Sequence, residues 1–239
     1  MEHTVPFDVW ARPVRLPISD IHVPTTMSTR KSTSLRDHAN AIFANMKNGL
    51  RNTFSLYRMA REQSFPDAKV KRTWSLDLFK VQSTPWLKPF TRIALDTYKQ
   101  VNQAFAAGDE KTVKRLTISN YEEDLRRRLR SQNANYVYVW KFHGESKPAK
   151  VVSIRAEEVN LSSSPVTYGN RLLIQACVKF ETTQSLEVYT KRGERVAGDG
   201  TPKPVVEYLV FQKRMWYDTP WVIRDQLFEG LQGRYTTTL

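Results

Sequence analysis

Residues 182–213 read TTQSLEVYTKRGERVAGDGTPKPVVEYLVFQK, which is a strand, a glycine-rich excursion and a second strand. Leu186 and Val188 in the first part and Tyr208 in the second are the aliphatic, β-branched and aromatic types that suit a half-buried pleated surface. The GDGTP run at 198–202 is turn chemistry. The stretch therefore predicts two strands of an antiparallel sheet joined by a long excursion.

The rest of the chain divides into helices followed by strands. Beyond residue 133 the apolar period changes from about 3.6 to 2. The strands predicted are 136–142, 151–159, 172–180, 185–189, 205–215 and 221–227. The helices predicted before them are 35–61, one from Thr84-Pro85 to Gly108, one from Asp109 to Leu116, and 121–130. Helices first and an antiparallel meander afterwards indicate an α+β fold.

Local signals fix the ends and buried faces of these helices. Thr84 is the expected N-cap of the second helix, Asp109 of the third, and Ser119 with Glu122 fits a capping box for the fourth. The buried face expected for the second helix is Trp86, Phe90, Ile93, Ala94, Val101 and Phe105.

The first predicted helix, 35–61, combines an apolar stripe with a basic ridge. The stripe is Leu35, Ala39, Ile42, Met46, Leu50 and Tyr57, the kind of face that a helix normally turns to the core. The ridge is Arg36, Lys47, Arg51, Arg58 and Arg61, within an arc of about 80°. Asp37 and Glu62 are the only acids nearby. We expect the ridge to contact phosphate or lipid headgroups, with a plain solvated surface as the alternative.

The first 33 residues predict an extended arm. Its prolines recur too often for a helix, and its apolar residues are too few to form a core, so we expect it to gain order only on another surface. The domains expected are the arm 1–33, a basic helical segment 34–83, an α+β domain 84–230 and a tail 231–239. Further candidate contacts to a polyanion are Arg30, Lys31, Lys69, Lys71, Arg72 and Arg130.

The charge balance points to a polyanionic partner. The formal net charge is +13, from 37 Lys and Arg against 24 Asp and Glu in 239 residues. Nucleic acid and an anionic membrane surface both fit such a balance. No run approaches the roughly 20 apolar residues needed to cross a bilayer. The single cysteine, Cys177, excludes an internal disulfide and is expected to be structural.

Three further patterns have competing interpretations. In the run 122–130 each acid precedes an arginine by four residues, which is typical of a self-paired helix face, although Arg130 is left over to meet phosphate. Tyr136, Tyr138 and Trp140 alternate on one strand face, where core packing is favoured over base stacking. The histidines show no metal-ligand spacing, so neither a metal nor a cofactor is expected.

The strand region resembles the mitochondrial large-subunit ribosomal protein forty-five family and its relative, the Mba-type mitoribosome receptor of the inner membrane. The residues that carry the resemblance are Gln184-Ser185-Leu186, Val188-Tyr189, Gly193, Pro202-Lys203, Val206-Glu207-Tyr208, Val210-Phe211, Lys213, Trp221 and Arg224. Weaker similarity reaches back to about Trp86. The resemblance implies a Tim-forty-four-like domain, that is, the cone of the nuclear-transport-factor-two class, with helices packed on a strongly curved sheet.

The same resemblance implies a function. It implies a structural component of the mitochondrial large ribosomal subunit, in the matrix, that binds rRNA and neighbouring ribosomal proteins near the tunnel exit. Contact with the inner membrane or its insertase would help co-translational insertion, and no small-molecule substrate is implied. One alternative is a peripheral inner-membrane adaptor of the import-motor type. The other is a cone-fold isomerase or dehydratase, for which His143, Glu145 and Tyr138 are the nearest candidate set, although His143 adjoins an expected turn.

Overall fold

The computed structural model describes residues 5–6, 13–14, 18–24, 35–67, 87–160 and 165–229. It contains helices, a main antiparallel sheet and a separate two-stranded sheet of β1 and β2. The helices are α1 Leu35–Arg61, α2 Lys88–Ala107, α3 Glu110–Leu116 and α4 Ser119–Ser131. The strands are β1 Val5–Pro6, β2 Pro13–Val14, β3 Tyr136–Glu158, β4 Leu172–Thr190, β5 Arg195–Ala197, β6 Lys203–Arg214 and β7 Val222–Leu227. The predicted α+β class is confirmed.

The main sheet has the order β3-β4-β6-β7, and β5 pairs with the far end of β4. The stretch 182–213 behaves as predicted, because Thr182 lies opposite Val205 and Gln184 opposite Lys203 in an antiparallel pair. Its excursion folds back tightly on β4. A side chain at Gly198, where φ is +76°, would place a Cβ 2.1 Å from the carbonyl oxygen of Leu186. Glycine is therefore required there.

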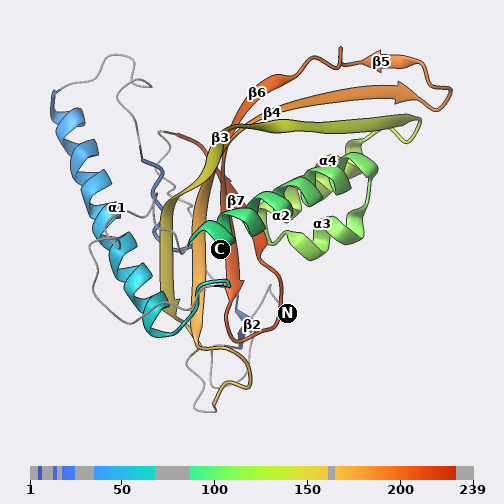
Figure 1. Cartoon of the computed structure of the whole chain (residues 1–239). Helices are drawn as coiled ribbons and strands as arrows, with labels where there is room; N and C mark the ends of the chain where they lie inside the picture. The colour runs from blue at the N-terminus through green and yellow to red at the C-terminus, as the bar shows by residue number, and fades with distance from the viewer. Residues whose placement is uncertain are drawn as a thin grey trace.

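Strands β3 and β4 are far longer than predicted, since each joins two segments that the sequence pattern separated. The turn expected at Gly144 and Lys147-Pro148 does not form. The chain stays extended and bends, with register shifts between Phe142 and Gly144 and again on to Lys150. Pro148 is tolerated because β3 is an edge strand. Figure 1 shows the result: one half of β3 and β4 stands beside α1, and the other half reaches over α2 and α4. The cone itself stays a prediction.

The main core lies between one face of the sheet, α2–α4 and the C-terminal part of α1, which contributes Leu56, Met59 and Ala60. β4 contributes Ile174, Ala176, Val178 and Phe180, all fully buried. From α2 come Phe90, Ala94, Tyr98, Val101 and Ala104, with Ile93 and Phe105 only partly buried. Of the predicted buried face, Trp86 lies outside the described residues.

The helix caps follow the predictions only in part. Asp109 caps α3 as expected, accepting hydrogen bonds from the backbone N–H groups of Lys111 and Thr112, both at 3.1 Å. The side-chain hydrogen bond from Thr112, followed by the bond from its backbone N–H, lowers the pKa of Asp109. The capping box predicted for α4 is wrong, because its N-cap is Ile118 with no side-chain bond. The N-cap of α2 is Leu87, not Thr84, which lies outside the described residues.

A second, smaller core covers the opposite face of the sheet. Cys177, Tyr208 and Val210 are buried there beneath residues 18–24, of which Val23 is 7% exposed and Ile18 and Ile21 pack against the cluster. The prediction that the arm gains order only on an external surface therefore fails for 18–24. The structural role predicted for Cys177 fits its position, since burial raises the pKa of its thiol and keeps it uncharged.

An ion-pair cluster across β3 and β4 makes acid stability testable. Lys147 Nζ and Lys179 Nζ each lie 2.8 Å from a carboxylate oxygen of Glu181. Hydrogen bonds from the two lysines, that of Lys147 first, lower the pKa of Glu181 to about 2. A carboxyl with a lowered folded pKa stabilises the fold above its ordinary pKa near 4.5, and this contribution is lost as the pH falls towards about 2.

We expect Glu181→Gln to lower the free energy of unfolding at about pH 7 by up to about 1 kcal/mol, since the pair is partly solvated. The difference from the wild type should vanish by about pH 2. Urea unfolding across the pH range measures this. Glu194→Gln, in the exposed turn after β4, is the matched control. A constant difference at all pH values would show that packing, not the charge, carries the effect.

Candidate functional site

Helix α1 is held along the outer edge of β3 by side-chain amides. Asn48 and Asn52 donate from Nδ2 to the carbonyl oxygen of Val152 at 3.1 and 3.4 Å, and the N–H of Ile154 donates to Asn52 Oδ1 at 2.9 Å. These are backbone groups of an edge strand, which otherwise remain open for another strand. The amides therefore substitute for a missing neighbour strand.

A buried arginine completes this contact. Arg155, 5% exposed, donates from Nη1 to Asn52 Oδ1 and from Nη2 to Asn48 Oδ1, both at 2.8 Å. Its Nε donates to the carbonyl oxygen of Asp20 at 2.9 Å, so the same guanidinium ties the segment 18–24 to α1. Burial lowers the pKa of Arg155 to about 10, which leaves it charged at neutral pH.

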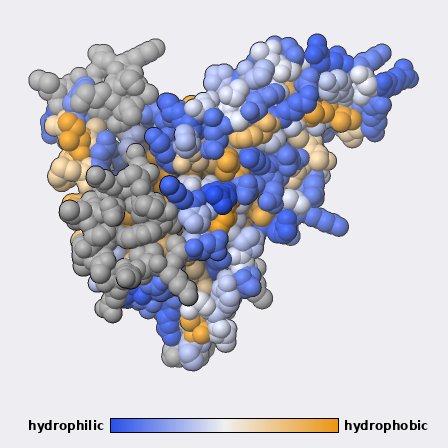
Figure 2. Space-filling model, viewed as in Figure 1, coloured by the Kyte–Doolittle hydropathy of each residue, from blue (hydrophilic) through white to orange (hydrophobic). Residues whose placement is uncertain are grey.

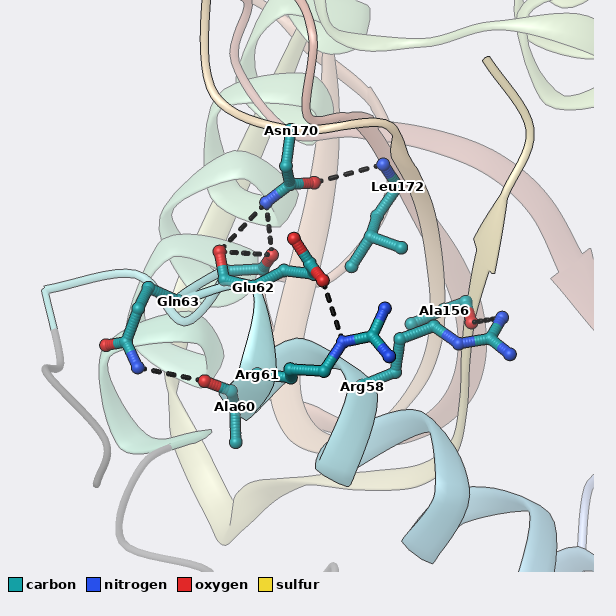
Figure 3. A network of polar contacts seen from close by, with 9 residues as sticks. Arg58, Ala60, Arg61, Glu62, Gln63, Ala156, Asn170 and Leu172 are labelled. Atoms are coloured by element: carbon teal, nitrogen blue, oxygen red, sulfur yellow. Dashed lines mark hydrogen bonds and ion pairs between the residues drawn. The ribbon is translucent and has the colours of Figure 1, made fainter. Parts of the chain in front are cut away.

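The C-terminal end of α1 is fixed by a second polar network, drawn in Figure 3. Arg58 Nη1 donates to the carbonyl oxygen of Ala156 at 2.9 Å, a fourth bond between α1 and the backbone of the β3 edge. Asn170, just before β4, donates to the carbonyl oxygen of Glu62 at 3.1 Å and accepts from the N–H of Leu172 at 3.0 Å. The position of α1 on the sheet is thus set by hydrogen bonds along its length and at its end, together with the burial of Leu56, Met59 and Ala60 in the main core.

Because the polar side of α1 faces the sheet, much of its apolar side faces outward. The exposed large hydrophobic residues of α1 are Ile42 (54%), Phe43 (66%), Met46 (61%), Leu50 (52%) and Phe54 (64%). We call this set the outer apolar stripe. Figure 2 shows hydrophobic atoms exposed on this side of the molecule. The usual orientation of an amphipathic helix is reversed here for Ile42, Met46 and Leu50, whereas Tyr57 packs partly against the core.

The basic ridge lies beside this stripe, and more of its cations are paired with acids than predicted. Arg51 pairs with Asp20, and Arg61 Nε lies 2.8 Å from Glu62 Oε1. Arg58 is used on the edge of β3, and Arg36 is also engaged in an interaction. Lys47 is exposed. The compensating Asp20 is distant in sequence, so the local count of acids could not find it.

The remaining predicted site residues are separated from the ridge or lie outside the described residues. Arg130 is exposed near the end of α4. Those outside the described residues are Arg30, Lys31, Lys69, Lys71 and Arg72. The structure therefore places four ridge arginines and Lys47 on one helix and Arg130 on another.

The self-paired interpretation of α4 is confirmed for the pairs Glu122–Arg126 and Asp124–Arg128, whereas Arg127 pairs with Asp124 and not with Glu123 as expected. Arg128 lies 2.6 Å from Asp124, Arg127 also pairs with Asp124, and Arg126 lies 3.6 Å from Glu122. Arg126 is held further by Glu110 of α3 at 2.8 Å. These arginines stabilise the helical layer and are partly neutralised, which leaves Arg130 as the better candidate for contact with phosphate.

The aromatic row of β3 behaves as predicted at Trp140. Its ring packs against the core with a centroid 6.4 Å from that of Tyr98, and its Nε1 donates to Gln184 Oε1 at 2.7 Å. Tyr98 also donates to Glu207, and burial is the main cause that raises its pKa. This buried polar cluster was not predicted, because its members are far apart in the sequence.

The candidate enzymatic set does not assemble into a site. His143 Nε2 lies 2.8 Å from Ser185 Oγ, Glu145 accepts from the N–H of Ala149 at 2.8 Å, and Tyr138 accepts from the N–H of Asn133 at 3.3 Å. Each residue is thus engaged with a different partner. Within the described parts of the chain, no cluster of three or more acidic, histidine or cysteine side chains is suited to hold a metal ion, and no helix is long and apolar enough to cross a membrane.

Comparison with known proteins settles the family. The family model described as MBA1-like protein matches residues 68–232, which is more than half of the chain. This chain belongs to the MBA1-like protein family. The family assignment predicted from the strand region is confirmed, and the match begins before Trp86, where the predicted similarity ended. Helix α1 precedes the part matched to the MBA1-like family.

A curated relative of this MBA1-like chain is named large ribosomal subunit protein mL45, from Xenopus tropicalis. The two are 33% identical over 76 residues, which is 32% of this chain and 22% of the relative. The matched part of the chain therefore spans about a fifth of that protein's length.

Proposed function

We propose that this chain is a non-enzymatic structural component of the mitochondrial large ribosomal subunit, bound to rRNA and to neighbouring ribosomal proteins. The observation that carries the proposal is the 33% identity to large ribosomal subunit protein mL45, in a chain that belongs to the MBA1-like protein family. This function places the protein in the mitochondrial matrix. We propose further that it lies near the tunnel exit and helps to attach the ribosome to the inner membrane or its insertase.

The charges of the molecule support an RNA partner. A net charge of +13 attracts a polyanion over a long range. Exposed cations such as Arg130 can displace counterions from phosphates, which gives binding that is strong and sensitive to salt. Charges that already have a carboxylate partner, such as those of Arg127 and Arg128, contribute less.

Sedimentation of mitochondrial lysate at moderate salt tests the assignment. Co-migration of the full-length chain with the large ribosomal subunit is the expected result. A pool that is found only with membranes, and never with the subunit, would contradict the ribosomal assignment and favour an inner-membrane adaptor of the import-motor type.

The phosphate contacts can be tested one charge at a time. We expect Arg130→Gln to bind large-subunit rRNA more weakly, and the slope of log K against log salt to fall by about 1, because one phosphate is no longer neutralised. Lys141→Gln is the matched control, because Lys141 is exposed but already pairs with Glu187 at 2.7 Å. Binding constants measured over a salt titration give the slope for each variant. An unchanged slope in this variant would remove Arg130 from the interface.

A further inference from the structure

The outer apolar stripe is a continuous surface feature and not a scatter of single residues. At 100° per residue its five members span an arc of about 120°, and from Ile42 to Phe54 they cover about 18 Å of helix. Each is more than half exposed. Isolated exposed apolar residues need no explanation, but a contiguous group of this kind marks a surface that binds something.

The surroundings of the stripe define three faces on α1. One face carries Asn48, Asn52 and Met59 and is buried against the sheet. The outer apolar stripe is the second. The third is the basic ridge, which borders the stripe on one side at Lys47 and Arg51. An apolar surface edged by cations on a helix that lies flat on its own protein matches the pattern of interfacial amphipathic helices.

We propose that this face of α1 lies in the plane of an anionic lipid bilayer. The stripe enters the boundary between headgroups and acyl chains, and Lys47, the exposed ridge cation beside the stripe, meets the lipid phosphates. The inference deepens the proposed attachment to the inner membrane and rests on that part of the proposed function. It does not depend on which rRNA the protein contacts.

The stripe itself favours lipid over RNA as the occupant. A phosphate backbone is bound by cations and hydrogen-bond donors, for which the ridge alone would suffice. Phe43 and Phe54 carry rings, but the other three members of the stripe, Ile42, Met46 and Leu50, offer neither a charge nor a ring on which a base can stack. A bilayer uses both features of the surface at once, since apolar burial and attraction to anionic headgroups add together.

Flotation of the full-length protein with vesicles tests the proposal. The vesicles are phosphatidylcholine alone and phosphatidylcholine mixed with phosphatidylglycerol. The stripe variant is Phe43→Ser/Met46→Ser/Leu50→Ser. The matched control is Val137→Ser/Leu186→Ser/Val206→Ser, three apolar residues of the sheet that are 48%, 50% and 56% exposed.

We expect the wild type and the control to float with the mixed vesicles and not with phosphatidylcholine alone. The stripe variant should bind the mixed vesicles at least about tenfold more weakly, because it loses most of the inserted area. All three proteins should still sediment with the large ribosomal subunit. Sedimentation with the subunit separates the ribosomal proposal from the bilayer proposal. A wild type that failed to bind the subunit would contradict the ribosomal assignment alone.

Three outcomes would overturn the bilayer assignment. The first is vesicle binding by the stripe variant that equals that of the wild type. The second is a wild-type dimer that the stripe variant converts to a monomer in sedimentation velocity, which would assign the stripe to a second copy of the chain. The third is a stripe variant that loses the ribosomal subunit while the wild type ignores vesicles, which would assign the stripe to a ribosomal partner.

Discussion

Replacing Phe90 with alanine should lower the free energy of unfolding by about 3–5 kcal/mol, since a fully buried aromatic ring is removed and a cavity remains. Phe90 is 1% exposed, and its ring centroid lies 4.6 Å from that of Trp221 and 6.2 Å from that of Phe211. It therefore joins α2 to two segments of the sheet. Removing it costs packing on every side, because α2 cannot move into the cavity without separating from the rest of the core.

Urea unfolding measures the effect, and Phe54→Ala is the matched control. Phe54 is 64% exposed on α1, so the same substitution there should change the stability by less than about 0.5 kcal/mol. If Phe90→Ala lowered the free energy of unfolding no more than Phe54→Ala does, the result would contradict the packing of α2 on the sheet described above.

The second large effect is expected at the edge of β3. Asn52→Ala should cost about 2–4 kcal/mol, because it leaves the N–H of Ile154 and the buried charge of Arg155 without their shared acceptor. The effect should be local as well as global. Hydrogen exchange at the amide of Ile154 should become faster, since that bond to α1 is removed.

Asn40→Ala provides the control on the same helix. Asn40 is exposed, and alanine is the better helix former, so this variant should be neutral or slightly stabilised. Slow exchange at Ile154 in Asn52→Ala would mean that another group protects this edge, and that the amides of α1 are not what holds the helix in place.

The reversed orientation of α1 shows where sequence analysis fails and why. The helix itself, from 35 to 61, is predicted at its observed bounds. Its orientation is not, because the apolar period suggests which side is buried only when burial of apolar area decides the contact. Here hydrogen bonds to a strand edge decide it. Asn48 and Asn52, four residues apart on one side, were the available signal.

The strands show a different limit. Alternation locates most residues of the main sheet but misses 143–150, 181–184 and β5, and Gly144 and Pro148 suggest a chain reversal. In an edge strand the same residues permit a bend with shifts in register. Whether glycine and proline turn a chain or bend it depends on which neighbour the strand has, and a local sequence window does not contain that neighbour. The ion pair between Asp20 and Arg51 could not be predicted for the same reason, because the two residues are far apart in the sequence.

The attachment of α1 by its polar side has an evolutionary consequence. The residues that hold the helix, Asn48, Asn52 and Arg58, point towards the sheet and are constrained by the geometry of β3. The residues of the outer apolar stripe are not constrained by the geometry of β3. Natural variation can therefore alter what this surface binds while the sheet underneath stays the same, so the docking specificity of α1 and the stability of the domain are free to change separately.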